Sequence, residues 1–417
     1  MQKLFIKGKK EISGNIFISG SKNATLPILA ASLLANEVKL LNVPFVKDIF
    51  TMIELLKFIG IIVKIKKDNK IIELINKKKI KTLAPYKLVK TMRAGVLVLG
   101  PLLTKYKKAK VSLPGGCAIG TRPVDLHLFA LKKLGAKIVI KDGYIIAKAP
   151  NGLKGTRIKF PSISVGATEN AILAAFGAKG KTTLLNCAIE PEIIDLVSFL
   201  KKLGCVINIK GRKIIILNKK LLKKKISHKI IFDRIEAGTY LIAGALIGNK
   251  IIINHVKPSV INCEINILKK MGVNIKITKN SIKILKSNNL KKINIITKPY
   301  PGFPTDLQAQ LMVLMTQAKG LSTIKENIFE NRYMHVPELK RMGAKIEIKN
   351  KTAYIKGPSN LTGAEVMATD LRASVSLVLA GLISDNRTIL NRIYHLDRGY
   401  EFLENKLKNC KAIIQRI

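Results

Sequence analysis

The chain has 417 residues, of which 47% are hydrophobic and 24% charged, so it falls among globular proteins that bury sizeable cores. With 74 Lys and Arg against 26 Asp and Glu, its formal net charge is +48. The basic residues are spread along the whole chain with few aromatics beside them. This pattern indicates biased codon usage and a solvated surface, and it argues against a nucleic-acid interface.

Several other classes of protein are also disfavoured. The longest apolar stretches, such as residues 24 to 35 and 373 to 383, are shorter than the roughly 20 residues that cross a bilayer. The N-terminus has no apolar block followed by small residues, so we expect no signal peptide. The five cysteines are widely spaced and form no CxxC pair, which disfavours a disulfide framework or a zinc site. We therefore expect a cytoplasmic protein without a membrane or metal partner.

Taken in chain order, one signature recurs six times. Basic residues are followed by an apolar-Gly turn and an alternating strand, as in KFIGIIVKI, KKLGAKIVI, KKLGCVINI, KKMGVNIKI and KRMGAKIEI, with a degenerate last copy KNCKAIIQRI. The turn glycines are Gly60, Gly135, Gly204, Gly272 and Gly343, with Lys411 in the sixth position, and successive copies lie 68 to 75 residues apart. The pattern predicts a helix closed by a left-handed glycine and followed by a half-buried strand.

A second signature has the same period. Polar residues precede long apolar runs rich in Ala, Leu and Val, which predict six helices buried on all sides: KNATLPILAASLLA, TMRAGVLVLGPLLTK, GATENAILAAFGAKG, DRIEAGTYLIAGALIGNK, TDLQAQLMVLMTQAKG and TDLRASVSLVLAGLIS. Such helices need covering, so we expect two domains of three repeats each. The segment 219–229, between the third and fourth repeats, is interpreted as the crossover between them.

The starts of these buried helices carry unexpected charge. Lys22, Arg93 and Arg372 lie there, and a fourth start has the Ser-Val-Gly-Ala-Thr turn of residues 164–168. A helix N-terminus already offers free N–H groups and a positive dipole end, so added cations indicate an anion site. Capping by Ser, Thr and Asp is the simpler alternative, although it does not require Lys or Arg.

Two further segments carry reactive groups. The loop LPGGCAIGTRPVDLH at 113–127 sets Cys117 among glycines near Arg122, which indicates a reactive thiol, with a small residue in a tight turn as the alternative. Asp306 lies at the start of a predicted helix, after two prolines. Its two interpretations are a helix N-cap and a general base. In two more segments, 329–339 and 394–407, Arg332 and Arg398 lie beside aromatic and acidic residues, with a structural ion pair as the alternative. Half of the twelve arginines fall in these segments and helix starts, namely Arg93, Arg122, Arg234, Arg332, Arg372 and Arg398. Together they indicate a small, multiply anionic substrate.

Nine segments, in order, resemble the UDP-N-acetylglucosamine 1-carboxyvinyltransferases over essentially the whole chain. They are SGSKNATLPILAA, LVKTMRAG, LPGGCAIGTRPVDLH, FPSISVGATENAI, EPEIIDL, FPTDLQAQ, FENRYMHVPEL, MATDLRAS and RIYHLDRGYE. The resemblance implies an α/β enolpyruvyl transferase fold, with two inverse α/β barrel domains and three βαβαββ-like repeats in each. It places the first domain, with the Cys117 loop, at residues 22–230 and the second at residues 1–21 and 231–417.

The resemblance also implies the activity. Members transfer the enolpyruvyl group of phosphoenolpyruvate to the 3-hydroxyl of UDP-N-acetylglucosamine and release phosphate, which starts peptidoglycan precursor synthesis. The route is addition and elimination through a tetrahedral ketal, with no metal or organic cofactor, and we expect a monomer. The alternatives are a 5-enolpyruvylshikimate-3-phosphate synthase, whose family lacks the cysteine loop, and an inactive or basic binding protein.

Carried over by position, the resemblance implies a role for each site residue. Cys117 would donate the proton and Asp306 would act as base. The phosphate of phosphoenolpyruvate would contact Lys22, Arg122 and Arg398, and its carboxylate would contact Arg332 and Arg372. The sugar nucleotide would be bound by Asn23, Arg93, Arg122, Pro123, Val124, Asp125, Leu126, Ser162, Ile163, Ser164, Val165, Asp306 and Ile328. Some members have Lys where this chain has Ser162, so a hydroxyl or backbone N–H would replace that contact.

Overall fold

Each repeat folds as a four-stranded mixed sheet with helices between its strands. The computed structural model describes residues 2–76, 79–115, 124–217 and 225–417. Across this part of the chain six sheets share one spatial arrangement of strands, which in four of them reads first-second-fourth-third in chain order, while in the other two a strand from a distant segment takes one of the four places. The first strand is parallel to the second, and the fourth is antiparallel to both of its neighbours. The six predicted repeats are therefore confirmed as six copies of one β-sheet topology.

The chain divides into two compact units. The first unit contains the described residues from Gly20 to Ile231, and the second contains those up to Ser19 together with Phe232–Ile417. Three sheets belong to each unit, and each unit has its own hydrophobic core. The domain boundaries implied by the resemblance, 22–230 against 1–21 plus 231–417, stay a prediction about independent domains.

In the first unit the elements are α1 Lys22–Ala31, η1 Ser32–Leu34, β3 Glu37–Leu41, α2 Lys47–Ile59, β4 Ile61–Lys66, β5 Ile71–Asn76, β6 Leu83–Ala84, α3 Tyr86–Val89, η2 Arg93–Val98, α4 Leu99–Tyr106, β7 Lys108–Ser112, α5 Asp125–Lys133, β8 Lys137–Lys141, β9 Tyr144–Lys148, β10 Arg157–Lys159, α6 Val165–Ala175, β11 Lys181–Leu185, α7 Pro191–Lys202, β12 Val206–Lys210, β13 Lys213–Leu217 and β14 Lys225–Lys229.

In the second unit they are β1 Leu4–Lys7, β2 Ile12–Phe17, α8 Arg234–Ile247, β15 Gly248–Asn254, η3 Pro258–Ile261, α9 Asn262–Lys270, β16 Asn274–Ile277, β17 Ser281–Leu285, β18 Asn294–Ile296, η4 Thr305–Leu307, α10 Gln308–Met315, β19 Gly320–Lys325, α11 Val336–Arg341, β20 Lys345–Lys349, β21 Thr352–Gly357, β22 Glu365–Met367, α12 Leu371–Ile383, β23 Arg387–Asn391, η5 Ile393–Arg398, α13 Leu403–Asn409 and β24 Ile413–Arg416.

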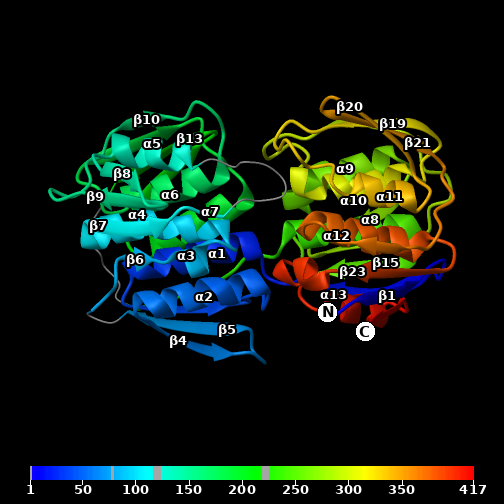
Figure 1. Cartoon of the computed structure of the whole chain (residues 1–417), viewed down its shortest axis with the longest axis horizontal. Helices are drawn as coiled ribbons and strands as arrows, with labels where there is room; N and C mark the ends of the chain where they lie inside the picture. The colour runs from blue at the N-terminus through cyan, green and yellow to red at the C-terminus, as the bar shows by residue number, and fades with distance from the viewer. Residues whose placement is uncertain (1, 77–78, 116–123, 218–224) are drawn as a thin grey trace. The chain divides into compact units, whose positions relative to one another are not determined.

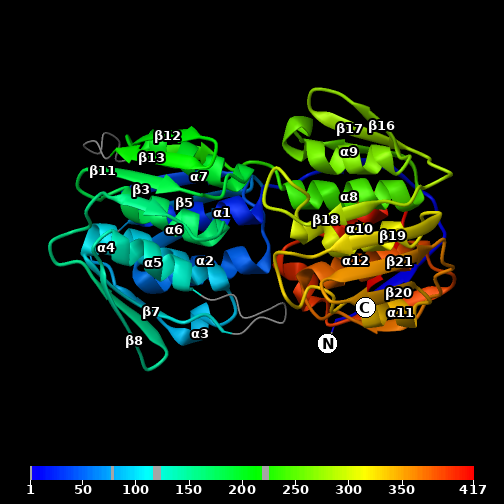
Figure 2. The same cartoon turned by 90° about the horizontal axis from the view of Figure 1, so that it is seen from above.

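The six apolar runs form the buried centre of the two units. In the second unit α8, α10 and α12 pack against one another, and in the first unit most residues of α1, α4 and α6 are buried. Figures 1 and 2 show these helices inside each unit, with strands toward its outside. The prediction of six core helices is confirmed, although the second starts as the short 3₁₀ helix η2 and the fifth as η4.

Strands distant in sequence complete three of the repeats. In the first unit β14 pairs in parallel with β3, and in the second unit β2 pairs in parallel with β15 while β1 joins β23 and β24. The interpretation of 219–229 as a crossover is therefore wrong for residues 225–229, because they form β14 inside a sheet. The chain passes between units at Ser19 to Gly20 and at Ile231 to Phe232.

The predicted turn glycines all have positive φ, from 89° at Gly272 to 121° at Gly60. Lys411 has the same conformation, with φ 70°, although it carries a side chain. The helix end is thus a left-handed turn in all six repeats, whatever the residue.

The implied barrel needs a correction. The sheets among the described strands are six open, four-stranded sheets, and none of them closes on itself. The α/β class, the repeats and their grouping by three are confirmed without a closed barrel. Short sheets of four strands have two edges each and gain their stability from the helices packed on them.

The described helices include none that is both long enough and apolar enough to span a bilayer. Cys187, Cys205, Cys263 and Cys410 are free thiols.

Candidate functional site

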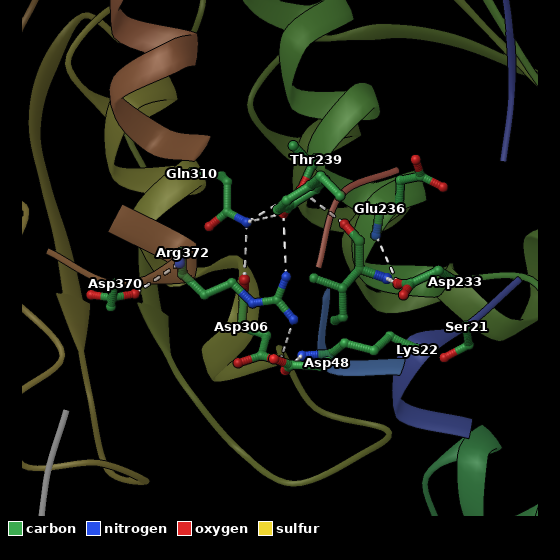
Figure 3. Close-up of polar contacts among 12 residues, drawn as sticks. Ser21, Lys22, Asp48, Asp233, Glu236, Thr239, Asp306, Gln310, Asp370 and Arg372 are labelled. Atoms are coloured by element: carbon green, nitrogen blue, oxygen red, sulfur yellow. Dashed lines mark hydrogen bonds and ion pairs between the residues drawn. The ribbon is translucent and has the colours of Figure 1, made fainter. Parts of the chain in front are cut away.

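In the second unit one carboxylate bridges two arginines. Arg332 Nη2 donates to Asp306 Oδ1 over 2.6 Å, and Arg372 Nη2 donates to Asp306 Oδ2 over 2.7 Å. The arginine side chains are only 3% and 8% exposed, whereas Asp306 is 26% exposed. Figure 3 shows Arg372 directed at Asp306. The sequence placed these three residues in separate segments, and the fold brings them together.

Local structure fixes the position of each of the three groups. Asp370 caps α12, with its Oδ1 accepting from the backbone N–H of Arg372 over 2.7 Å, so Arg372 lies in the first turn of a buried helix. Asp306 lies in η4, before α10. The buried Glu326 connects the segment that carries Asp306 to the segment after β19. Its Oε2 accepts from Thr305 Oγ1 over 2.9 Å, and its Oε1 accepts from the N–H of Ile328 over 2.7 Å.

The electrostatics of this cluster favour charged arginines. Burial alone would lower the pKa of Arg372, but the charge of Asp306 outweighs it and the pKa is raised. Two buried guanidinium groups that share one carboxylate are the arrangement in which charge-assisted hydrogen bonds are strongest. The cluster can therefore hold a planar carboxylate, and Asp306 can accept a proton when its arginines are engaged elsewhere.

In the first unit a lysine takes the corresponding place. Lys22 is the first residue of α1, which Ser21 caps by accepting from the N–H of Ala24 over 3.2 Å. Its Nζ forms an ion pair with Asp48 Oδ2 over 3.1 Å, with the two side chains 11% and 8% exposed. Figure 3 shows the pair with Ser21. A buried ammonium at a helix N-terminus is a point charge suited to phosphate.

Arg93, at the start of η2, lies near a buried histidine. His127 is 4% exposed, and burial first and the charge of Arg93 second lower its pKa to about 3. Its Nδ1 is 3.2 Å from Asn170 Nδ2, whose other contact is the Val96 carbonyl. Since the amide donates, Nδ1 accepts. The imidazole is neutral at pH 7, so Arg93 remains the cation of this cluster.

The remaining predicted residues occupy loops and helix starts. Ser164 caps α6 by accepting from the N–H of Ala167 over 3.3 Å, and Ser162 before it is exposed. Other positions were predicted to contact the substrates, and the structure leaves those contacts untested: Asn23 in α1, Val124, Asp125 and Leu126 at α5, Ile163 and Val165 at α6, Ile328 after β19, and Arg398 at the end of η5. Cys117, Arg122 and Pro123 lie outside the described residues.

Several site residues were missed from sequence. Asp48 looked like an ordinary acid in the first turn of an amphipathic helix, and only the fold places it against Lys22. Tyr400 lies inside the motif RIYHLDRGYE, yet nothing in that motif shows that its hydroxyl contacts Arg372 Nη1 at 3.3 Å.

No three His, Cys, Asp or Glu side chains among the residues with described positions are grouped to hold a metal ion.

Known proteins resemble this chain along its whole length. The sequence profile of the family described as EPSP synthase (3-phosphoshikimate 1-carboxyvinyltransferase) matches residues 6–407. A UDP-N-acetylglucosamine 1-carboxyvinyltransferase of Pelagibacter ubique is 59% identical, and one of Rickettsia akari is 51% identical, each over 100% of both chains.

Solved structures agree on the fold. The enolpyruvyl transferase NikO of Streptomyces tendae has a TM-score of 0.90 at 23% identity, covering 100% of this chain and 98% of its own. The EPSP synthase of Acinetobacter baumannii has a TM-score of 0.77 at 17% identity, covering 100% of both. From the fold, and from identity above 50% over full length, the chain belongs to the enolpyruvyl transferases, in the family of the UDP-N-acetylglucosamine 1-carboxyvinyltransferases.

Proposed function

We propose that this protein transfers the enolpyruvyl group of phosphoenolpyruvate to the 3-hydroxyl of UDP-N-acetylglucosamine and releases phosphate. The product feeds peptidoglycan precursor synthesis. The observation that carries the proposal is the 59% identity, over the full length of both chains, to a relative of that name. The paired arginines on Asp306 support it, because phosphoenolpyruvate presents a carboxylate beside a phosphate.

The reaction needs an acid, a base and a cage of cations. Protonation of the methylene carbon leaves an oxocarbenium-like C2, which the sugar 3-oxygen attacks as its proton passes to a base. The new methyl group then loses a proton while the C2–O bond to phosphate breaks. Cations around the phosphate and carboxylate stabilise the charge that develops.

Asp306 is assigned as the base, with Arg332 and Arg372 as the carboxylate site. Since Asp306 already accepts one hydrogen bond from each arginine, the substrate carboxylate competes with it for the same donors. Binding of phosphoenolpyruvate would thus release Asp306 toward the sugar hydroxyl. This couples activation of the base to the binding of phosphoenolpyruvate.

The other contacts are assigned by position in the family motifs. Lys22, Arg122 and Arg398 would bind the phosphate of phosphoenolpyruvate. Asn23 and Arg93 would contact the sugar nucleotide, with further contacts from Arg122, Pro123, Val124, Asp125, Leu126, Ser162, Ile163, Ser164, Val165 and Ile328. We further propose two domains, at 22–230 and at 1–21 plus 231–417, and a cytoplasmic monomer that acts on these small molecules alone.

Phosphate release with two acceptors tests the activity. The purified protein should release phosphate from phosphoenolpyruvate when UDP-N-acetylglucosamine is present and release none with shikimate 3-phosphate. The reverse preference would make the protein an EPSP synthase. No turnover with either acceptor, combined with steeply salt-dependent binding to nucleic acid, would favour a basic binding protein.

Cys117 is assigned as the proton donor to the methylene carbon. Replacing it with Ser should reduce turnover strongly and abolish alkylation by an epoxide phosphonate of the fosfomycin type. Cys263, which is half-buried, serves as the matched control, because Cys263→Ser should leave both turnover and labelling unchanged. Labelling that persists in Cys117→Ser would reject the assignment.

A further inference from the structure

Beside the contact between Arg372 and Asp306 lies a buried network of uncharged groups. Arg372 Nη1 donates to the Tyr400 hydroxyl over 3.3 Å, and that hydroxyl is 2.8 Å from Thr239 Oγ1. Gln310 Nε2 shares its two protons among the Asp306 carbonyl at 3.0 Å, Thr239 Oγ1 at 3.2 Å and the same Tyr400 hydroxyl at 3.3 Å. The residues come from α8, α10, α12 and the turn after η5, and Figure 3 shows Thr239, Gln310 and Arg372 converging.

The direction of these hydrogen bonds follows from proton counting. A hydroxyl has one proton to donate. Thr239 Oγ1 donates its proton to the Ile235 carbonyl over 2.8 Å, so the short contact to Tyr400 must be a donation from Tyr400. The Tyr400 oxygen then presents only lone pairs to Arg372 Nη1 and Gln310 Nε2. The order is Arg372 to Tyr400 to Thr239 to the Ile235 carbonyl, and each step has one donor.

Burial keeps this order intact at neutral pH. Tyr400 is 3% exposed and Thr239 1%, with Gln310 wholly buried. Burial raises the pKa of Tyr400, and although Arg372 opposes that shift, the phenol remains protonated. The ring also lies near the guanidinium, with Cζ 5.8 Å from its centroid. The Tyr400 hydroxyl therefore contacts Arg372 only as a hydrogen-bond acceptor, and it does not compete with the guanidinium for a bound anion.

We propose that Tyr400, oriented by Thr239, is a positioning residue that fixes the Arg372 guanidinium for the carboxylate of phosphoenolpyruvate. The proposal rests on the proposed function, because it assigns the partner of Arg372 within that reaction. This role differs from a contribution to folding alone, because the Tyr400 hydroxyl contacts Arg372 Nη1 while Nη2 of the same guanidinium contacts Asp306. Removing the hydroxyl frees Nη1 and lets the guanidinium rotate away from the carboxylate position.

Tyr400→Phe tests the hydroxyl while keeping the ring. We expect KM for phosphoenolpyruvate to rise about ten-fold, the loss associated with one hydrogen bond to a charged group, with KM for UDP-N-acetylglucosamine changed less than about two-fold. Tyr240→Phe is the matched control. Tyr240 is the neighbour of Thr239 in α8, is 1% exposed, and its hydroxyl has no hydrogen-bond partner in the described part of the chain, so neither KM should change.

Two substitutions of Thr239 test the direction of the network. Thr239→Val leaves the Tyr400 proton without its acceptor and should raise KM for phosphoenolpyruvate about three- to ten-fold. Thr239→Ser keeps the hydroxyl and should restore the wild-type value. This pair keeps the test valid even if Tyr400→Phe unfolds, and thermal melting of each variant identifies loss of fold.

The outcomes separate this inference from the proposed function. A wild-type enzyme that turns over, with a Tyr400→Phe variant of unchanged KM for phosphoenolpyruvate, overturns the positioning role alone. Equal rises in both KM values would indicate a general structural role and would overturn it as well. A wild-type protein without turnover overturns the proposed function first.

Discussion

The two units share one scaffold but place different cations at the starts of their buried helices. In the second unit two buried arginines share Asp306, and a hydrogen-bonded phenol holds one of them. In the first unit a single lysine pairs with Asp48 at the equivalent helix start. Both cations lie in the first turn of a helix whose N-cap side chain accepts a backbone hydrogen bond, Ser21 for α1 and Asp370 for α12. The repeat supplies equivalent positions, and the residue placed there decides between a planar guanidinium and a compact point charge.

The units also share a device that keeps histidine neutral beside arginine. Burial and Arg93 lower the pKa of His127 to about 3. For His335, burial and Arg332 outweigh the opposing charge of Asp370 and lower the pKa to about 4. A second cation near either arginine would repel it, so a neutral imidazole fills the space without adding charge.

The largest expected effect comes from Asp306→Asn. Turnover should fall about 10³-fold, within the range for a lost general base, while the sugar nucleotide still binds. Asp385→Asn is the control, since Asp385 lies in the same unit and pairs with the exposed Lys9. Phosphate release under saturating substrates is the measurement, and a wild-type rate for Asp306→Asn would reject its role as base.

Arg372→Lys sharpens the difference between the units. It keeps the charge but loses the planar fork, so KM for phosphoenolpyruvate should rise about ten- to a hundred-fold. Arg341→Lys, at an exposed position in α11, should have no measurable effect. An Arg372→Lys enzyme with the wild-type KM would show that point charges suffice in both units.

The pH dependence of stability distinguishes the two histidines. Because His127 titrates near 3 when folded and near its ordinary value of about 6.5 when unfolded, its contribution is present above pH 6.5 and is lost as the pH falls toward 3. His127→Gln removes this loss. Between pH 7 and 4.5 the variant should lose about 2 kcal/mol less unfolding free energy than the wild type, which denaturant titrations can measure.

The His335 site in the second unit should keep its own acid sensitivity in the His127→Gln variant. Parallel pH profiles of wild type and variant would contradict the assignment of a buried neutral His127.

The smallest effect concerns the sixth repeat. Lys411 has φ 70° where the other five repeats have glycine. Lys411→Gly should stabilise the protein by about 0.5 to 1 kcal/mol, since relief of the left-handed strain exceeds the entropy that glycine adds to the unfolded chain. Lys408→Gly, in the last turn of α13, should destabilise it instead. Unfolding in urea measures both changes, and a Lys411→Gly variant less stable than the wild type would contradict the assignment of backbone strain to Lys411.

Local patterns predicted the architecture well. The turn glycines and the apolar runs are short-range signals, and the helix ends and core helices follow them. Pairing between distant segments left no such signal. Nothing in residues 12–17 shows that they pair with 248–254. The run KISHK was interpreted as part of a crossover because its pairing partner, β3, lies almost 190 residues earlier in the chain.

The site shows the same division. Arg332 and Arg372 stood out by residue type, because lysine is the usual cation in this chain, and Asp306 stood out by its position after two prolines. Their contacts, and the contact of the Tyr400 hydroxyl with Arg372, join segments that lie far apart in the sequence. Asp48 could not be told from an ordinary first-turn acid, because only its contact with Lys22 distinguishes it.

The most direct test of the carboxylate site is ligand binding to Asp306→Asn. Calorimetry would compare pyruvate, which has a carboxylate and no phosphate, with inorganic phosphate, for wild type and variant. If Asp306 competes for Arg332 and Arg372, the variant should bind pyruvate about ten-fold more tightly and gain clearly less for phosphate. Equal gains for both anions, or none for pyruvate, would contradict a carboxylate site that Asp306 shares with the substrate.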